Sequence, residues 1–209
     1  MLGNLVGVTT SPRGAPSFTM VRHGESDWNA ARLVQGQDDT SRLTSLGRMQ
    51  ARDVADALRN TAVDRIVASD LRRAYETAVI IGTTLGLMPE LDSLLRERCF
   101  GVFEAGPGND LTSDATGHAR GVVLDGDARP PEGESLREVV ARAGRFIDRA
   151  TREWPDERLL VVTHGGMINA LHLFTFGEPL EGRPWYRVGN CDMWSLEGPL
   201  TTSPGDDAI

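Results

Sequence analysis

Two histidines and a pair of adjacent arginines follow three short β-rich runs of the chain. Arg22 and His23 come after the first run, Arg72 and Arg73 after the second, and His164 after the third. A neutral histidine is a competent nucleophile toward phosphorus near pH 7, and the planar fork of an arginine can bind two phosphate oxygens at once. These residue types indicate phosphoryl-transfer chemistry, provided that the three runs bring them together.

The three runs have the length and apolar composition of buried strands, and they cover residues 17–21, 64–69 and 158–163. A helical stretch follows each of them. This alternation predicts an α/β fold, a three-layer sandwich with a mostly parallel central sheet and helices on both faces. Ligands of open α/β sheets bind beyond the carboxyl ends of the strands, so the histidines and arginines are expected to face one crevice. Residues 90–94 and 192–196 are two further candidate strands.

Capping residues and chain breakers mark the ends of three helices. The predicted helices are Leu46–Asn60, capped by Thr44 or Ser45; a helix from Ser69 or Asp70 to about Leu85; and Leu136–Trp154, capped by Ser135 and ended by Pro155. In the third helix Glu138 would complete a capping box with Ser135. An apolar stretch after His164 predicts a fourth helix.

The remaining segments carry weaker structural signals. We expect a flexible leader over residues 1–16, a single domain over residues 17–200 and a flexible tail over residues 201–209. Within the domain, residues 101–133 are rich in Gly, Pro and Asp and favour no regular element. Because a long irregular loop in a compact domain is usually functional, this segment is expected to serve the site.

The composition is that of a soluble protein, with 40% hydrophobic and 25% charged residues in a chain of 209. A net charge of −8 argues against nucleic acid as a partner, and no apolar stretch is long enough for a membrane span. The first residues lack a secretory pattern, and Cys99 and Cys191 cannot form a disulfide framework. A cytoplasmic location is therefore expected. No cluster has metal-ligand spacing, so we expect neither a metal nor another cofactor.

Several short blocks resemble the histidine phosphatase superfamily, in its phosphoglycerate-mutase-like branch. The blocks are RHGES at 22–26, WN at 28–29, QGQDD at 35–39, SDLRRAYETA at 69–78, LRE at 95–97, GES at 133–135 and THGG at 163–166. They occur in the order typical of the family, from about Ser17 to Leu196. An isolated RHG triplet would be weak evidence, whereas this ordered set is specific.

The resemblance implies a role for each matching catalytic residue. His23 would carry the phosphoryl group as a phosphohistidine, and Arg22, Arg73 and His164 would hold the phosphoryl oxygens. Glu97 would give a proton to the leaving alkoxide and then activate water. For in-line attack His23 must keep one ring nitrogen free, so its other N–H needs an acceptor, and a backbone carbonyl near Gly24 is the predicted one.

The resemblance also implies a set of substrate-binding positions, namely Asn29, Ser26, Gln35, Gly36 through its backbone N–H, and Gly165. Arg72 is expected to contribute positive charge only. Residues 101–133 occupy the place of the segment that covers the pocket in relatives. The partner would be a small phosphorylated metabolite, with no nucleic acid and no membrane. Relatives of this kind are often dimers, so the resemblance allows a homodimer.

Two reactions and a third role are compatible with these residues. Water may accept the phosphoryl group from His23, which makes the chain a phosphatase, or a second hydroxyl may accept it, which makes a mutase that depends on a phosphorylated cofactor. Mutases of the family have a longer insertion before the second histidine, so the shorter cover here favours hydrolysis of a phosphomonoester without metal. Arg98 is a mutase-like feature. A phosphate-binding module without turnover is the third alternative, and intact Glu97 and His164 argue against it.

Overall fold

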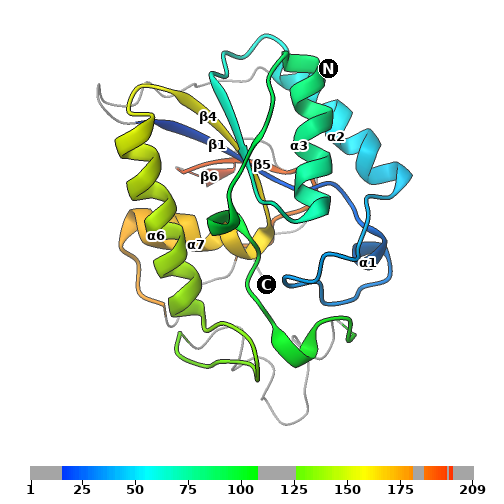
Figure 1. Cartoon of the computed structure of the whole chain (residues 1–209), viewed down its shortest axis with the longest axis vertical. Coiled ribbons are helices and arrows are strands. Elements are labelled where there is room, and N and C mark those ends of the chain that lie inside the picture. The colour runs from blue at the N-terminus through cyan, green and yellow to red at the C-terminus, as the bar shows by residue number, and fades with distance from the viewer. Residues whose placement is uncertain (1–15, 108–125, 181–185, 197, 200–209) are drawn as a thin grey trace.

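The computed structural model describes residues 16–107, 126–180, 186–196 and 198–199 (Figure 1). The predicted leader, except for Pro16, and the predicted tail lie outside the described residues. So do residues 108–125 of the predicted cover segment. In the described ranges, none of the helices is long and apolar enough to cross a membrane.

A six-stranded sheet with the order β3-β2-β4-β1-β5-β6 forms the centre of the described chain. Its strands are β1 (Ser17–Arg22), β2 (Arg65–Ala68), β3 (Glu90–Leu91), β4 (Arg158–Thr163), β5 (Met193–Ser195) and β6 (Gly198–Pro199). The first four in chain order pair in parallel, whereas β5 and β6 pair antiparallel. The predicted mostly parallel sheet is therefore confirmed.

The two candidate strands of the sequence are shorter than predicted. Residues 90–94 contribute only Glu90–Leu91, because the Asp92 side chain accepts a hydrogen bond from the Leu94 N–H and starts a 3-10 helix, η1 (Ser93–Leu95). Residues 192–196 contribute only Met193–Ser195. Both strands lie on the outer parts of the sheet, where pairing to a single long neighbour limits their length.

Helices cover both faces of the sheet (Figure 1). They are α1 (Asp27–Ala30), α2 (Ser45–Leu58), α3 (Arg72–Leu85), α6 (Leu136–Glu153) and α7 (Gly165–Phe176), with a second 3-10 helix, η2 (Gly101–Phe103). Successive side chains of a strand point to opposite faces, so Met20 packs in the core beneath α6 and α7 and Val21 in the core beneath α2 and α3. The three-layer sandwich is confirmed.

The predicted helix caps hold for two helices and fail for a third. Thr44 caps α2, and Ser135 and Glu138 form the expected capping box of α6. Helix α3 begins later than predicted, with Leu71 at its N-cap and no side-chain cap. Ser69 and Asp70 cannot cap it, because the Ser69 hydroxyl contacts a histidine ring and Asp70 forms an ion pair with an arginine.

Candidate active site

Strand register brings the two histidines of the signature blocks together. Arg22 pairs with Thr163, the last residues of β1 and β4, so His23 and His164 follow at the same edge of the sheet. Their ring centroids lie 5.2 Å apart at an interplanar angle of 62°. Both side chains are buried. The predicted convergence at the carboxyl ends of the strands is confirmed for these two residues.

Hydrogen bonds fix the tautomer of His23. Nδ1 lies 2.8 Å from the Gly24 carbonyl oxygen, which can only accept, so Nδ1 carries the proton. Nε2 therefore has a lone pair, and it accepts a hydrogen bond of 3.3 Å from Arg73 Nε. The Gly24 carbonyl is the acceptor that the sequence predicts.

The charge state of His23 suits a nucleophile. Burial lowers the pKa of the imidazole well below the ordinary 6.5, and the positive charges of Arg73 and Arg22 lower it further. The ring is thus neutral at physiological pH, with its lone pair on Nε2. A nucleophilic histidine needs this form, because a protonated ring has no lone pair to attack phosphorus.

The guanidinium of Arg73 is fixed by the loop that follows α1. Its NH1 donates to the Asp38 carbonyl at 3.0 Å and its NH2 to the Gly36 carbonyl at 2.7 Å. Burial is the main reason that its pKa falls to about 10, which still leaves it charged at neutral pH. Gly36 thus meets Arg73 through its carbonyl group, whereas contact of its N–H with substrate stays a prediction.

Arg22 and His164 each hold a buried nitrogen without a hydrogen-bond partner among the described residues. Arg22 NH1 donates to the Val188 carbonyl at 2.6 Å, but its Nε has no partner. His164 Nε2 lies 2.9 Å from Ser69 Oγ, and its Nδ1 has no partner. Buried unsatisfied polar atoms cost free energy and call for an explanation. A bound phosphoryl group would supply acceptors at this position.

The Glu97 side chain lies against the N-terminus of α7, next to the second histidine. Its Oε2 accepts a hydrogen bond of 3.0 Å from the Gly166 N–H, and its Oε1 accepts one of 2.8 Å from the Arg98 N–H. A Cβ atom at Gly166 would come within 2.2 Å of Glu97 Oε1, so only glycine lets the carboxylate approach the helix here. Glu97 is thereby held close to His164, the N-cap residue of α7.

Ser26, Gln35 and Asn29 form one hydrogen-bonded group beside His23. Ser26 is the N-cap of α1 and makes a capping box with Asn29. The Ser26 hydroxyl also lies 2.9 Å from Gln35 Oε1. Because the Asn29 Oδ1 accepts from Ser26 and from Asn190, its amide NH2 is the group left to meet a phosphoryl oxygen. Substrate contacts of these three residues stay predictions.

Two contributors to this site are absent from the sequence-based set of catalytic and binding residues. Thr77 Oγ1 accepts from the Gly24 N–H at 3.0 Å and donates to the Arg73 carbonyl at 2.8 Å. Asn190 Nδ2 donates to the His23 carbonyl at 3.1 Å. Thr77 belongs to a block of the resemblance and could have been found there. Asn190 has no local signal except its place before the strand run 192–196.

Arg72 does not join the cluster, although the sequence places it beside Arg73. Its side chain is exposed, and its backbone N–H donates to Asp39 Oδ1 at 2.5 Å. Helical geometry explains the difference, because adjacent residues of a helix point in different directions. Within the described ranges, no group of three or more His, Cys, Asp or Glu side chains is arranged to hold a metal ion.

Comparison with known proteins agrees with this geometry. Residues 18–199 match the histidine phosphatase superfamily (branch 1). The chain belongs to the histidine phosphatase superfamily. Among curated proteins, the probable phosphoglycerate mutase GpmB of Yersinia pestis (strain Pestoides F) is 36% identical over 199 residues, which are 90% of this chain and 92% of the relative.

Solved structures that resemble this superfamily member include two phosphatases. A mycobacterial glucosyl-3-phosphoglycerate phosphatase complexed with VO3 has a TM-score of 0.77 and 33% identity, covering 87% of this chain and 92% of the other. The alpha-ribazole phosphatase of Shigella flexneri has a TM-score of 0.68 and 27% identity, covering 78% and 81%. Proteins named as phosphatases and as a probable mutase are thus both similar to this chain.

The buried histidine pair of this family member predicts a loss of stability on acidification. Burial lowers the pKa of both His23 and His164 well below 6.5, and Arg73 adds to the shift. The folded state holds both rings neutral, whereas the unfolded chain takes up protons below about pH 6.5. The free energy of unfolding therefore falls as pH drops below that value, by at most about 1.4 kcal/mol per pH unit for each ring.

Urea unfolding at pH values between 7 and 5 measures this slope. A double variant, His23→Asn with His164→Asn, should show a much smaller slope over the same range, because neither site then titrates. If the double variant lost stability on acidification as steeply as the wild type, the two histidines would not be buried neutral groups.

Proposed function

We propose that this histidine phosphatase hydrolyses a small phosphomonoester through a phosphohistidine at His23. The carrying observation is the state of His23, a neutral ring with its proton on Nδ1 and its lone pair on Nε2, next to the Arg73 guanidinium. Positive charge beside the nucleophile stabilises the equatorial oxygens of a metaphosphate-like transition state. The VO3 group bound by the mycobacterial relative resembles that planar arrangement.

In the first half-reaction the Nε2 lone pair forms a bond to phosphorus while the bond from phosphorus to the ester oxygen breaks. Glu97 transfers a proton to the departing alkoxide. The phosphorylated ring gains positive charge, and its Nδ1–H donates to the Gly24 carbonyl, which stabilises that charge. In the second half-reaction Glu97 takes a proton from water as the water oxygen attacks phosphorus, and inorganic phosphate leaves with His23 restored.

The alternative is a phosphoglycerate-type mutase, which the name of the Yersinia relative favours. The position of Arg98 supports hydrolysis instead. Its side chain is buried, with Nε donating to the Glu134 carbonyl at 2.8 Å and NH2 donating to the Ala128 carbonyl at 3.0 Å. An arginine so engaged by the backbone anchors the cover segment and is poorly placed to bind a substrate carboxylate. The mutase-like residue of the sequence thus has a structural use here.

Release of phosphate from p-nitrophenyl phosphate in the presence of EDTA tests the proposal. We expect turnover that the chelator leaves unchanged, because the positive charge around the phosphoryl group comes from arginines. Phosphoryl transfer to water is distinguished from transfer to a second hydroxyl with 3-phosphoglycerate, supplied with and without 2,3-bisphosphoglycerate. Isomerisation that outpaces phosphate release in the presence of the bisphosphate would establish a mutase, and no turnover of any phosphomonoester would leave only a binding module.

A further inference from the structure

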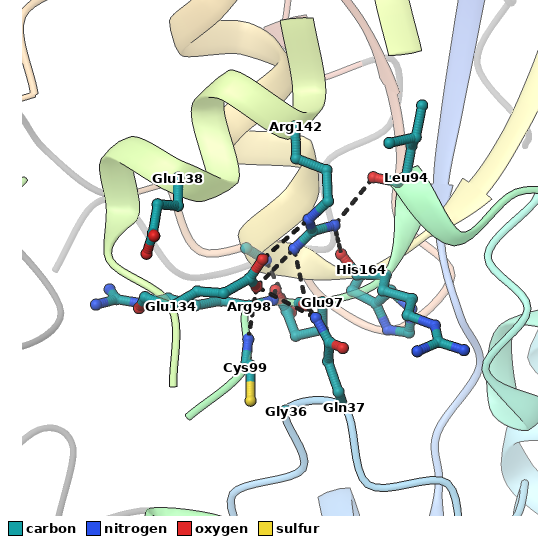
Figure 2. Close-up of polar contacts among 12 residues, drawn as sticks. Gly36, Gln37, Leu94, Glu97, Arg98, Cys99, Glu134, Glu138, Arg142 and His164 are labelled. Atoms are coloured by element: carbon teal, nitrogen blue, oxygen red, sulfur yellow. Dashed lines mark hydrogen bonds and ion pairs between the residues drawn. The ribbon is translucent and has the colours of Figure 1, made fainter. Parts of the chain in front are cut away.

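Arg142 is a buried arginine that lies away from the phosphoryl-binding cluster. It stands on α6 and is 7% exposed. Figure 2 shows its side chain descending from the helix toward the segment that holds Glu97 and the base of the cover. A buried guanidinium needs a full set of acceptors, because each unsatisfied N–H in the interior costs free energy.

Three of the acceptors are backbone carbonyls of the segment that ends at Glu97. Arg142 NH1 donates to the Leu94 carbonyl at 2.9 Å and to the Arg96 carbonyl at 2.5 Å, and NH2 donates to the Glu97 carbonyl at 3.1 Å (Figure 2). After η1, residues 96–100 belong to no helix or strand. The guanidinium therefore takes the place of secondary structure and sets the backbone from which the Glu97 carboxylate projects.

The remaining N–H groups of Arg142 meet a carboxylate. Nε donates to Glu134 Oε1 at 3.2 Å and NH2 to Glu134 Oε2 at 2.8 Å, the bidentate geometry that suits an arginine. Glu134 Oε2 also accepts from the Cys99 N–H at 2.9 Å. The carboxylate neutralises the buried charge and joins the two ends of the cover segment, next to Glu97.

Gln37 connects this ion pair to the loop that fixes Arg73. Its Nε2 donates to the Glu97 carbonyl at 3.0 Å and to Glu134 Oε2 at 3.2 Å. The loop of residues 35–39 therefore contacts the proton donor on one side and the phosphate-binding arginine on the other. These bonds connect the Glu97 backbone to the loop that fixes the Arg73 guanidinium.

We propose that Arg142, paired with Glu134, is a positioning residue for Glu97 and thereby controls proton transfer to the leaving group. The inference rests on the proposed function, in which Glu97 is the acid. Every N–H of the guanidinium is used here, and a lysine ammonium has fewer donors and no planar fork. Arg142→Lys keeps the charge but cannot hold all three carbonyls and the carboxylate, so the Glu97 carboxylate shifts.

The effect of this shift on the reaction rate depends on the leaving group. An alkoxide is a poor leaving group and needs a proton in the transition state, whereas p-nitrophenolate leaves without one. General acid catalysis contributes about 10²- to 10⁴-fold, and a displacement of about 1 Å can cost roughly 10²-fold. We therefore expect Arg142→Lys to lower kcat/KM for an alkyl phosphate such as 3-phosphoglycerate about 10- to 100-fold, with a loss of less than about threefold for p-nitrophenyl phosphate.

Arg149→Lys is the matched control, because Arg149 lies on the same side of α6 about two turns further on. Its NH2 forms an ion pair with Asp92 Oδ2 at 2.6 Å. Among the described residues, no hydrogen bond joins Arg149 to the three carbonyls that accept from Arg142. Both kcat/KM values should stay close to those of the wild type. Gln37→Ala removes the hydrogen bonds from Gln37 to the Glu97 carbonyl and to Glu134 Oε2 but keeps both members of the Arg142–Glu134 ion pair. It should show the same selective loss as Arg142→Lys to a smaller extent.

The outcomes separate this inference from the proposed function. Glu97→Gln should also lower kcat/KM for the alkyl ester more than kcat/KM for p-nitrophenyl phosphate. Equal losses on both esters in that variant would show that Glu97 is not the acid, and the proposed mechanism would fail. If Glu97→Gln lowers kcat/KM selectively for the alkyl ester but Arg142→Lys lowers it equally for both esters, Arg142 has a purely structural role. Only the positioning inference then fails. Should Arg142→Lys not fold, as judged by thermal melting, Gln37→Ala decides, and a loss on both esters alike would overturn the inference.

Discussion

His23→Ala is expected to lower kcat for every phosphomonoester by about 10⁴- to 10⁶-fold, the loss typical for removal of a catalytic nucleophile. His164, the other ring of the pair, contacts the Ser69 hydroxyl through its Nε2, so that nitrogen is not available to replace the Nε2 lone pair of His23. Trapping of labelled phosphate with a denaturing alkaline quench measures the same change directly. The wild type should hold an acid-labile, base-stable label, as expected for a phosphohistidine, and the variant should hold none.

His172→Ala is the matched control for this experiment. His172 is another buried histidine of the same fold, on α7, and its ring centroid lies 4.6 Å from that of Phe176 and 5.4 Å from that of Tyr186. These contacts make it a packing residue outside the active site, so its loss should affect stability and leave the phosphoenzyme intact. Acid-labile label that persists in His23→Ala would move the nucleophile to His164 and contradict the assignment.

Much of the fold follows from local sequence signals. Strands β2 and β4 are nearly continuous apolar runs because helices cover both of their faces, and such runs are recognisable without a partner. The cap of α3 shows where this reasoning fails. Ser69 has the right residue type for an N-cap, but its hydroxyl contacts His164, a residue 95 positions away. Tertiary contacts of this kind override a local preference.

Some residues of the site can likewise be found from local sequence, and others cannot. His23, Arg73, Glu97 and His164 stand in short blocks that the sequence displays, and register at the sheet edge brings the histidines together. Asn190 escapes such reasoning, because its contact with Asn29 spans 161 positions. The sequence does not reveal the role of Arg142 either, for a different reason.

An arginine on an amphipathic helix is usually a solvent-exposed residue. Only the folded structure shows that Arg142 is buried and that it donates to backbone carbonyls such as that of Leu94, 48 positions away in the chain. Residues 108–125 of the cover lie outside the described residues. A role of the cover segment in substrate choice stays a prediction.

Substitution of Arg73 is expected to have the second-largest effect, and two variants separate its charge from its geometry. Arg73→Met removes the donor to the phosphoryl oxygens, and loss of one such donor typically costs about 10²- to 10³-fold in kcat. It also removes a charge that lowers the pKa of His23, so that pKa should rise toward its ordinary value. A more basic nucleophile gains little compared with the lost stabilisation, so the rate still falls.

The pH dependence of kcat/KM makes the distinction measurable. Its acid limb, where His23 becomes protonated and inactive, should move to higher pH in Arg73→Met. In Arg73→Lys the limb should stay close to its wild-type position, because the charge is kept, while the rate falls since an ammonium cannot hold both loop carbonyls and the phosphoryl oxygens. Arg72→Met is the control, an exposed arginine one residue earlier. Equal losses in Arg72→Met and Arg73→Met would mean that general positive charge, rather than the fixed fork of Arg73, stabilises the transferred phosphoryl group.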